Sequence, residues 1–157
     1  MDMPEDKSET LVVGVGGAGE AIVGRLAKHH ADAGVRFCVG APRAKALERA
    51  ARVVVVVGLG GRSGGPRALL EIARAKARGA FTTVLAIRPF TFEGLARKKR
   101  ATNALAALRE AADELRVFDN DDLLGGDEDR DLAAAYRSCD EDLLALTRTS
   151  RPVPAPG

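Results

Sequence analysis

Residues 11–19 read Leu-Val-Val-Gly-Val-Gly-Gly-Ala-Gly, a short apolar run that passes directly into glycines. The apolar run indicates a buried strand. Apolar residues at helical spacing follow and predict a helix from Glu20 to Ala33, ended by Gly34. A GxGxxG pattern between a strand and a helix lets backbone N–H groups approach a phosphate at the positive helix end. The same pattern is also typical of a tight turn, so this loop alone does not establish a nucleotide site.

The rest of the chain repeats the alternation of strand and helix. The valines at 53–57 are typical of a central parallel strand covered on both faces. The further strands are predicted at 35–39, 52–57, 81–87 and 115–118, and the further helices at 44–51, 66–78, 95–114 and 131–146. This order predicts an α/β fold with a doubly wound parallel sheet.

Composition narrows the class of protein. A length of 157 residues predicts one domain, and a net charge of +2 is too small to indicate nucleic acid or a membrane as a partner. Cys38 and Cys139 are far apart and lack CxxC spacing, which argues against a disulfide framework or a metal site and favours a reduced compartment. The acidic start MDMPEDKSET does not resemble a signal peptide. We therefore expect a soluble cytoplasmic protein.

A second glycine cluster follows the valine strand. Residues 58–65 read Gly-Leu-Gly-Gly-Arg-Ser-Gly-Gly. Two such loops at the carboxyl ends of adjacent parallel strands can enclose one polyphosphate at the topological switch point. The pair of loops is therefore more specific for a nucleotide than either loop alone.

Three phrases carry a resemblance to a known family. They are GVGGAGEAIV at 14–23, GLGGRSGGP at 58–66 and RPFTFEG at 88–94. In order and spacing the chain resembles the tubulin/FtsZ family from about residue 10 to residue 146. The resemblance implies a Rossmann-like, GTPase-type nucleotide-binding domain over residues 10–150. Residues 1–9 lack apolar periodicity and predict a disordered lead-in, and residues 151–157 form a proline-rich tail.

The resemblance also implies a set of binding residues for GTP or GDP. The expected guanine contacts are Asn120, Tyr136 and Asp140, and Glu93 and Arg97 would lie near the ribose and phosphates. Tyr136 could equally face the core and Asn120 could equally be a turn residue. The expected phosphate cradle consists of the backbone amides of Gly16, Gly17, Gly60, Gly61, Ser63 and Gly64.

Several departures from the family pattern predict that nucleotide binding is weak or lost. Glu20 places a carboxylate beside the expected phosphate. In the second loop, Arg62 replaces a glycine and Pro66 removes a backbone donor, although the Arg62 guanidinium could partly replace lost donors. The polar phrase expected after the second strand is absent at 39–47, and so is the segment that carries the family's γ-phosphate loop. The carboxylates that activate water in the family would lie beyond the last helix, so we expect no catalytic residue and no GTP hydrolysis.

Three functional hypotheses remain open. The first is a degenerate FtsZ/tubulin-like domain, a pseudo-GTPase, that acts by interaction with a protein, either itself or a related cytoskeletal filament. The basic run at 97–100 and the acidic stretch at 119–131 would permit head-to-tail contact between copies. The second is a GTP- or GDP-binding module that signals by its bound state. The third is a Rossmann-type NADP-dependent enzyme, in which Arg43 would meet the 2′-phosphate.

Overall fold

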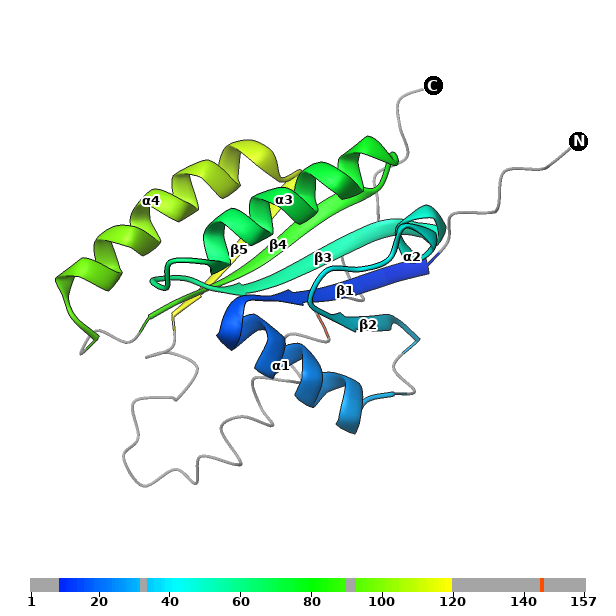
Figure 1. Cartoon of the computed structure of the whole chain (residues 1–157), viewed down its shortest axis with the longest axis horizontal. Coiled ribbons are helices and arrows are strands. Elements are labelled where there is room, and N and C mark those ends of the chain that lie inside the picture. Colours follow the sequence, from blue (N-terminus) through cyan, green and yellow to red (C-terminus); the bar gives the residue numbers. More distant parts are fainter. Residues whose placement is uncertain (1–8, 32–33, 90–92, 120–144, 146–157) are drawn as a thin grey trace, which may run out of the picture.

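The computed structural model describes residues 9–31, 34–89, 93–119 and 145. Five parallel strands form one sheet in the order β2-β1-β3-β4-β5 (Figure 1). The elements in chain order are β1 (Glu9–Val15), α1 (Gly16–His29), β2 (Arg36–Val39), α2 (Ala44–Arg49), β3 (Ala50–Gly58), α3 (Gly64–Ala77), β4 (Phe81–Arg88), α4 (Leu95–Ala111) and β5 (Glu114–Asp119). The predicted α/β fold with a parallel sheet is confirmed.

Successive valines of β3 supply both faces of the core, because neighbouring side chains on a strand point to opposite sides. Val53, Val55 and Val57 pack in one cluster with residues of α2, α3 and α4. Val54 and Val56 pack in a second cluster, which includes Val23 of α1. Figure 1 accordingly shows α3 and α4 on one side of the sheet and α1 on the other.

The switch point of the doubly wound fold lies between β1 and β3. The chain crosses from β1 to β2 by way of α1 on one face, and from β3 to β4 by way of α3 on the other face. The two crossovers leave the central pair of strands in opposite directions. In open α/β sheets, ligands bind outside the carboxyl ends of the strands at this point.

The bounds of α1 differ most from those predicted. The helix begins at Gly16 rather than Glu20 and ends at His29 rather than Ala33. Its first turn consists of Gly16, Gly17, Ala18 and Gly19, which carry no apolar periodicity, so the sequence pattern placed the start one turn late. Gly34 has a φ of 82°, but it lies beyond the helix end, in the turn before β2.

The other predicted elements agree with the structure to within about three residues at each end. The predicted helix at 131–146 lies outside the described residues except for Ala145, which is helical. In the part of the chain that the structure describes, no helix has the length and apolarity that crossing a bilayer would require.

Candidate functional site

The two glycine loops meet at the carboxyl end of the sheet. The first loop follows β1 and the second follows β3, and these strands are hydrogen-bonded neighbours. A Cβ atom placed on Gly16 would lie 3.1 Å from the Cα of Gly64, so the two backbones approach each other closely. The predicted position of both loops at one edge of the sheet is confirmed.

Four glycines at this edge are required by packing. A Cβ on Gly14 would overlap the carbonyl oxygen of Gly19, and a Cβ on Gly19 would overlap that of Val56. A Cβ on Gly58 would lie 2.5 Å from the Cβ of Ala18, and a Cβ on Gly64 would lie 2.9 Å from the Gly58 oxygen. These glycines therefore allow α1 and α3 to begin directly against the ends of the strands.

Gly17 and Gly61 have no such requirement. Both are exposed, neither has a positive φ, and a Cβ on either would meet no atom of the described residues within 4 Å. The internal structure of the domain would therefore accept a side chain at both positions. What they provide is bare backbone that an outside group could approach, which is how glycines serve a phosphate cradle.

An ion pair links the segments that follow the glycine loops. Arg67 of α3 donates to Oε1 of Glu20 on α1 over 3.2 Å, and the side chains of Arg67 and Glu20 are 43% and 35% exposed. A Cβ on Gly40 would lie 3.5 Å from that Glu20 oxygen and 4.0 Å from Nη2 of Arg67. The pair thus links α1 to α3 and lies close to Gly40, which follows β2.

The structure changes the interpretation of Glu20. Because α1 begins at Gly16, Glu20 lies in the second helical turn and not at the helix terminus. Its charge is balanced by Arg67. The sequence pattern around Glu20 does not point to Arg67, because a residue 47 positions away gives no local signal. Only the adjacency of β1 and β3 brings the two side chains together.

The second glycine loop packs against the start of α4. Arg100 donates from Nε to the Gly60 oxygen over 3.0 Å, and a Cβ on Gly60 would lie 3.3 Å from the Arg97 carbonyl oxygen. Arg97 forms an ion pair with Glu93 over 3.1 Å. The structure therefore places Arg97, one of the predicted site residues, beside the second loop, and pairs it with Glu93, another of them.

Arg62 lies on the side of the second loop that faces α4. It is exposed and lines a pocket of about 250 Å³ together with Pro66 and Arg100, among others. No residue of the first loop lines this pocket. Pro66 occupies the first turn of α3, where a missing N–H breaks no bond within the helix but leaves one donor fewer for an anion.

The remaining predicted site residues stand as follows. Ser63 is exposed at the N-cap of α3 and its hydroxyl makes no capping bond. Asn120, Tyr136 and Asp140 lie outside the described residues. No grouping of three or more His, Cys, Asp or Glu side chains that would suit a metal ion occurs within residues 9–31, 34–89 and 93–119.

The connection between β2 and β3 is short and held in place. α2 ends at Arg49 and β3 begins at the next residue. Arg74 of α3 donates to the Pro42 carbonyl oxygen over 2.9 Å and pairs with the buried Glu71 over 2.8 Å.

Burial and the nearby Glu71 raise the pKa of the Cys38 thiol, and Arg74 partly opposes this shift. The thiol is therefore protonated at neutral pH and unsuited to act as a nucleophile.

Comparison with known proteins identifies the relatives of this fold. Residues 43–126 match the family model described as Tubulin/FtsZ family, GTPase domain. The structure is similar to an FtsZ dimer from M. jannaschii, without ligand, with a TM-score of 0.68, 25% identity and coverage of 90% of this chain and 54% of that one. It is also similar to GDP-bound, monomeric CetZ1 from Haloferax volcanii, with a TM-score of 0.71, 16% identity and coverage of 92% and 62%.

A CetZ from Methanosaeta thermophila gives a TM-score of 0.67 at 21% identity, with coverage of 90% of this chain and 55% of that one. The two CetZ structures, at these identities, support the fold alone. The chain spans between 54% and 62% of the length of the three structures named here.

Proposed function

This chain belongs to the tubulin/FtsZ family, and on that premise we propose that it is a degenerate member that acts by protein interaction and does not hydrolyse GTP. Its partner would be a second copy or a related cytoskeletal filament. The observation that carries the proposal is the ion pair between Glu20 and Arg67 at the junction of the two glycine loops. A carboxylate of the chain already engages the cation that a phosphate would need.

A nucleotide phosphate entering this edge would meet an unfavourable balance of charge. It would either displace Glu20 from Arg67 or bind beside a carboxylate that carries charge of the same sign. Both side chains are partly exposed, so the repulsion is screened by water, and we expect it to weaken binding rather than to exclude an anion.

The short connection after β2 supports the same proposal. The family resemblance places a segment for the γ-phosphate between the second and third strands of this chain. Here α2 has six residues and passes directly into β3. The bond from Arg74 to the Pro42 oxygen ties the connection to α3, so it has little freedom to rearrange around a ligand.

One observation favours a second candidate function, a GTP- or GDP-binding module that signals by its bound state. Gly17 and Gly61 are exposed, and no packing among the described residues requires a glycine at either position. Their being glycines nevertheless needs another reason. Bare backbone amides at these positions would suit a phosphate. Arg62 and Arg100, which line the pocket beside the second loop, could add charge-assisted donors.

The first experiment measures nucleotide content and turnover. Purified protein is denatured and the released small molecules are separated by chromatography, and phosphate release from added GTP is followed separately. We expect no bound guanine nucleotide and a rate equal to that of a buffer control at every protein concentration. Bound guanine nucleotide would replace the first function with the second, and turnover that rises with protein concentration would contradict both.

The second experiment tests the role of the ion pair. Calorimetry compares GDP binding by the parent chain, by Glu20→Gln and by the matched control Glu48→Gln, which neutralises an exposed carboxylate on α2. Relief of repulsion in a partly exposed cleft is worth about 1–3 kcal/mol, so we expect Glu20→Gln to bind roughly ten- to a hundredfold more tightly. The control should equal the parent.

Variants of Arg62, in the second glycine loop, distinguish the two candidate functions. Under the first function, Glu20→Ser combined with Arg62→Gly binds GDP more tightly than the parent, because a carboxylate and a bulky side chain leave the cleft together. If Arg62→Gly alone weakens binding, Arg62 is a phosphate ligand and the second function is favoured. A double variant that binds no better than the parent would refute the role given to Glu20.

A further inference from the structure

The strand β2 forms one edge of the sheet in the part of the chain that the structure describes. It pairs with β1 on one side only, and its last residue, Val39, is 52% exposed. An edge strand presents backbone donors and acceptors that a further segment of polypeptide could satisfy. Proteins usually cover such an edge or place charges on it, which prevents pairing with another chain. The surface beside β2 therefore shows how this edge is protected or used.

An open groove of about 710 Å³ lies along this edge. Its apolar lining comes from β1, the end of α1, β2 and α2, with Leu11, Ala27, Val35, Phe37 and Ala46. Its charged lining is entirely cationic and consists of Arg36, Arg43, Lys45 and Arg49. Such a groove suits an acidic segment that also carries aliphatic side chains.

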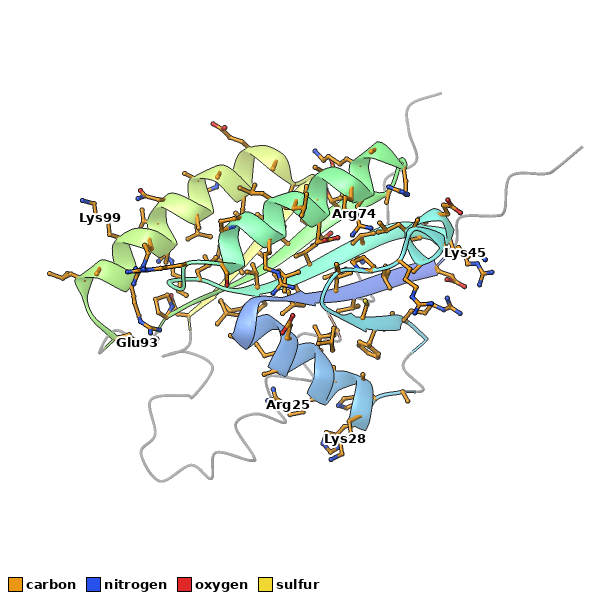
Figure 2. All side chains as sticks on the ribbon, in the orientation of Figure 1. Arg25, Lys28, Lys45, Arg74, Glu93 and Lys99 are labelled. Carbon is orange, nitrogen blue, oxygen red and sulfur yellow. The ribbon has the colours of Figure 1, made fainter. Side chains whose placement is uncertain are left out.

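Two of the four cations are available to a partner. Arg36 pairs with Glu9 over 3.5 Å. Arg43 and Lys45 are exposed and form no ion pair within the described ranges. Figure 2 shows Lys45 at one end of the long axis of the molecule and Lys99, in the basic run of α4, at the other. The groove is therefore separate from that basic run.

The chain itself contains a segment with the complementary chemistry. Residues 119–129 read Asp-Asn-Asp-Asp-Leu-Leu-Gly-Gly-Asp-Glu-Asp. They hold six carboxylates and no cation, and two adjacent leucines follow the first acidic group. The leucines match the apolar lining of the groove and the carboxylates match its cations.

The start of this segment is too far from the groove of its own chain. Asp119 ends β5 and pairs with Arg88 at the carboxyl end of β4, whereas the groove follows β2 and the first half of β1. Four strand spacings of about 4.8 Å and roughly six residues of strand separate them, which makes a diagonal of about 28 Å. Leu124 is five residues beyond Asp119 and reaches at most about 18 Å.

From these observations we propose that the cationic groove beside β2 binds the acidic segment 119–129 of a second copy of the chain. This inference rests on the proposed function, which it deepens by naming the partner and the surface. Because the groove and the segment are different parts of the chain, the contact is heterologous. Contacts of this type continue from copy to copy and give open chains unless the rotation closes a ring.

The test is a charge exchange in the full chain, followed by sedimentation over a range of protein concentrations at low and high salt. The groove variant carries Arg43→Glu and Lys45→Glu, and the segment variant carries Asp121→Lys and Asp122→Lys. Each should raise the dissociation constant for self-association by at least about tenfold, and the chain with all four substitutions should regain association. The parent should dissociate as salt rises, because exposed charges are screened.

The matched control is Lys98→Glu with Lys99→Glu, two exposed cations of α4 that do not line the groove. It should associate like the parent. A parent that stays monomeric at all concentrations, or a four-substitution chain that fails to regain association although circular dichroism shows it folded, would overturn the inference.

If the α4 control abolishes association and the groove variant does not, the groove inference fails while the protein-interaction function stands. If the parent turns over GTP, the proposed function fails, and the sedimentation result still decides whether the groove binds the segment.

Discussion

At the carboxyl end of the sheet, segments pack closely because glycines there carry no side chain. At the amino end, segments are instead held together by hydrogen bonds that side chains form. The carboxyl end is closed by Gly14, Gly19, Gly58 and Gly64, where a Cβ would meet backbone or side chain. At the amino end, Asp113 accepts from the Thr82 amide over 2.8 Å and from its hydroxyl over 3.0 Å. Beside it, the buried Arg52 donates to the Thr83 hydroxyl over 3.3 Å.

The difference shows why only one end offers a binding surface. At the amino end the polar groups that these bonds join are already satisfied within the domain. At the carboxyl end, backbone lies bare at Gly17 and Gly61, and the ion pair between Glu20 and Arg67 joins the two helices that follow the glycine loops. Five substitutions, besides their controls, test this contrast.

The largest effect is expected at Gly19. Alanine there would drive its Cβ into the carbonyl oxygen of Val56 in the central strand, and backbone in the middle of a sheet cannot yield cheaply. We expect Gly19→Ala to lower the free energy of unfolding by at least about 3 kcal/mol. Chemical denaturation measures this. The control Gly24→Ala lies in the same helix, where its Cβ would make an ordinary contact of 3.8 Å with Val39, and it should be neutral or stabilising.

The second effect is expected at Thr83, which lies at the centre of the amino-end network. Its hydroxyl accepts from Arg52 and donates to Oε2 of Glu114 over 3.4 Å. Thr83→Val keeps the shape and removes the two bonds from Arg52 and the one to Glu114, which leaves the buried guanidinium short of an acceptor. We expect a loss of about 2 kcal/mol in denaturant unfolding. Stability equal to that of the parent would show that these long bonds contribute nothing.

The third effect is expected at Asp113 and depends on pH. Burial alone would raise the pKa of Asp113, but the two hydrogen bonds from Thr82 and the nearby Lys76 lower it below its ordinary 3.8. A depressed carboxyl pKa stabilises the folded state at pH values above the unfolded pKa, and this stabilisation is lost as pH falls through the folded pKa. Asp113→Asn should therefore cost about 1 kcal/mol at neutral pH.

The difference between parent and Asp113→Asn should shrink below about pH 4. Thermal unfolding at a series of pH values measures it, with Glu110→Gln on the exposed side of α4 as the control. A difference that stays constant from neutral pH to pH 3 would contradict this assignment.

The smallest effects are expected at the two bare glycines. Gly17→Ala and Gly61→Ala should each change the free energy of unfolding by no more than about 0.5 kcal/mol, because neither Cβ meets another atom in the part of the chain that the structure describes. They also separate the candidate functions. Under the proposed function GDP calorimetry is unchanged by either substitution, whereas weaker binding in both would favour the nucleotide-binding module.

Much of the fold could be predicted because its signals are local. The valines of β3 and the glycines after β1 indicate a buried strand and a strand-to-helix turn without reference to the rest of the chain. The start of α1 was missed for the same reason, since its glycine-rich first turn lacks the periodicity that marks a helix. The family resemblance implied that Glu93 and Arg97 lie near the ribose and phosphates, which stays a prediction; the structure adds that Arg97 lies close to Gly60 of the second loop.

The sequence by itself determined the order of strands and helices, the two glycine loops and the family to which the chain belongs, because each is written in contiguous residues. Only the tertiary structure decided which glycines are needed for packing and which lie bare, since that depends on atoms from other strands. It also decided that Glu20 meets Arg67 and that four cations gather beside β2. The physical reason is that a parallel sheet pairs β1 with both β2 and β3, and so brings together side chains that are far apart along the chain.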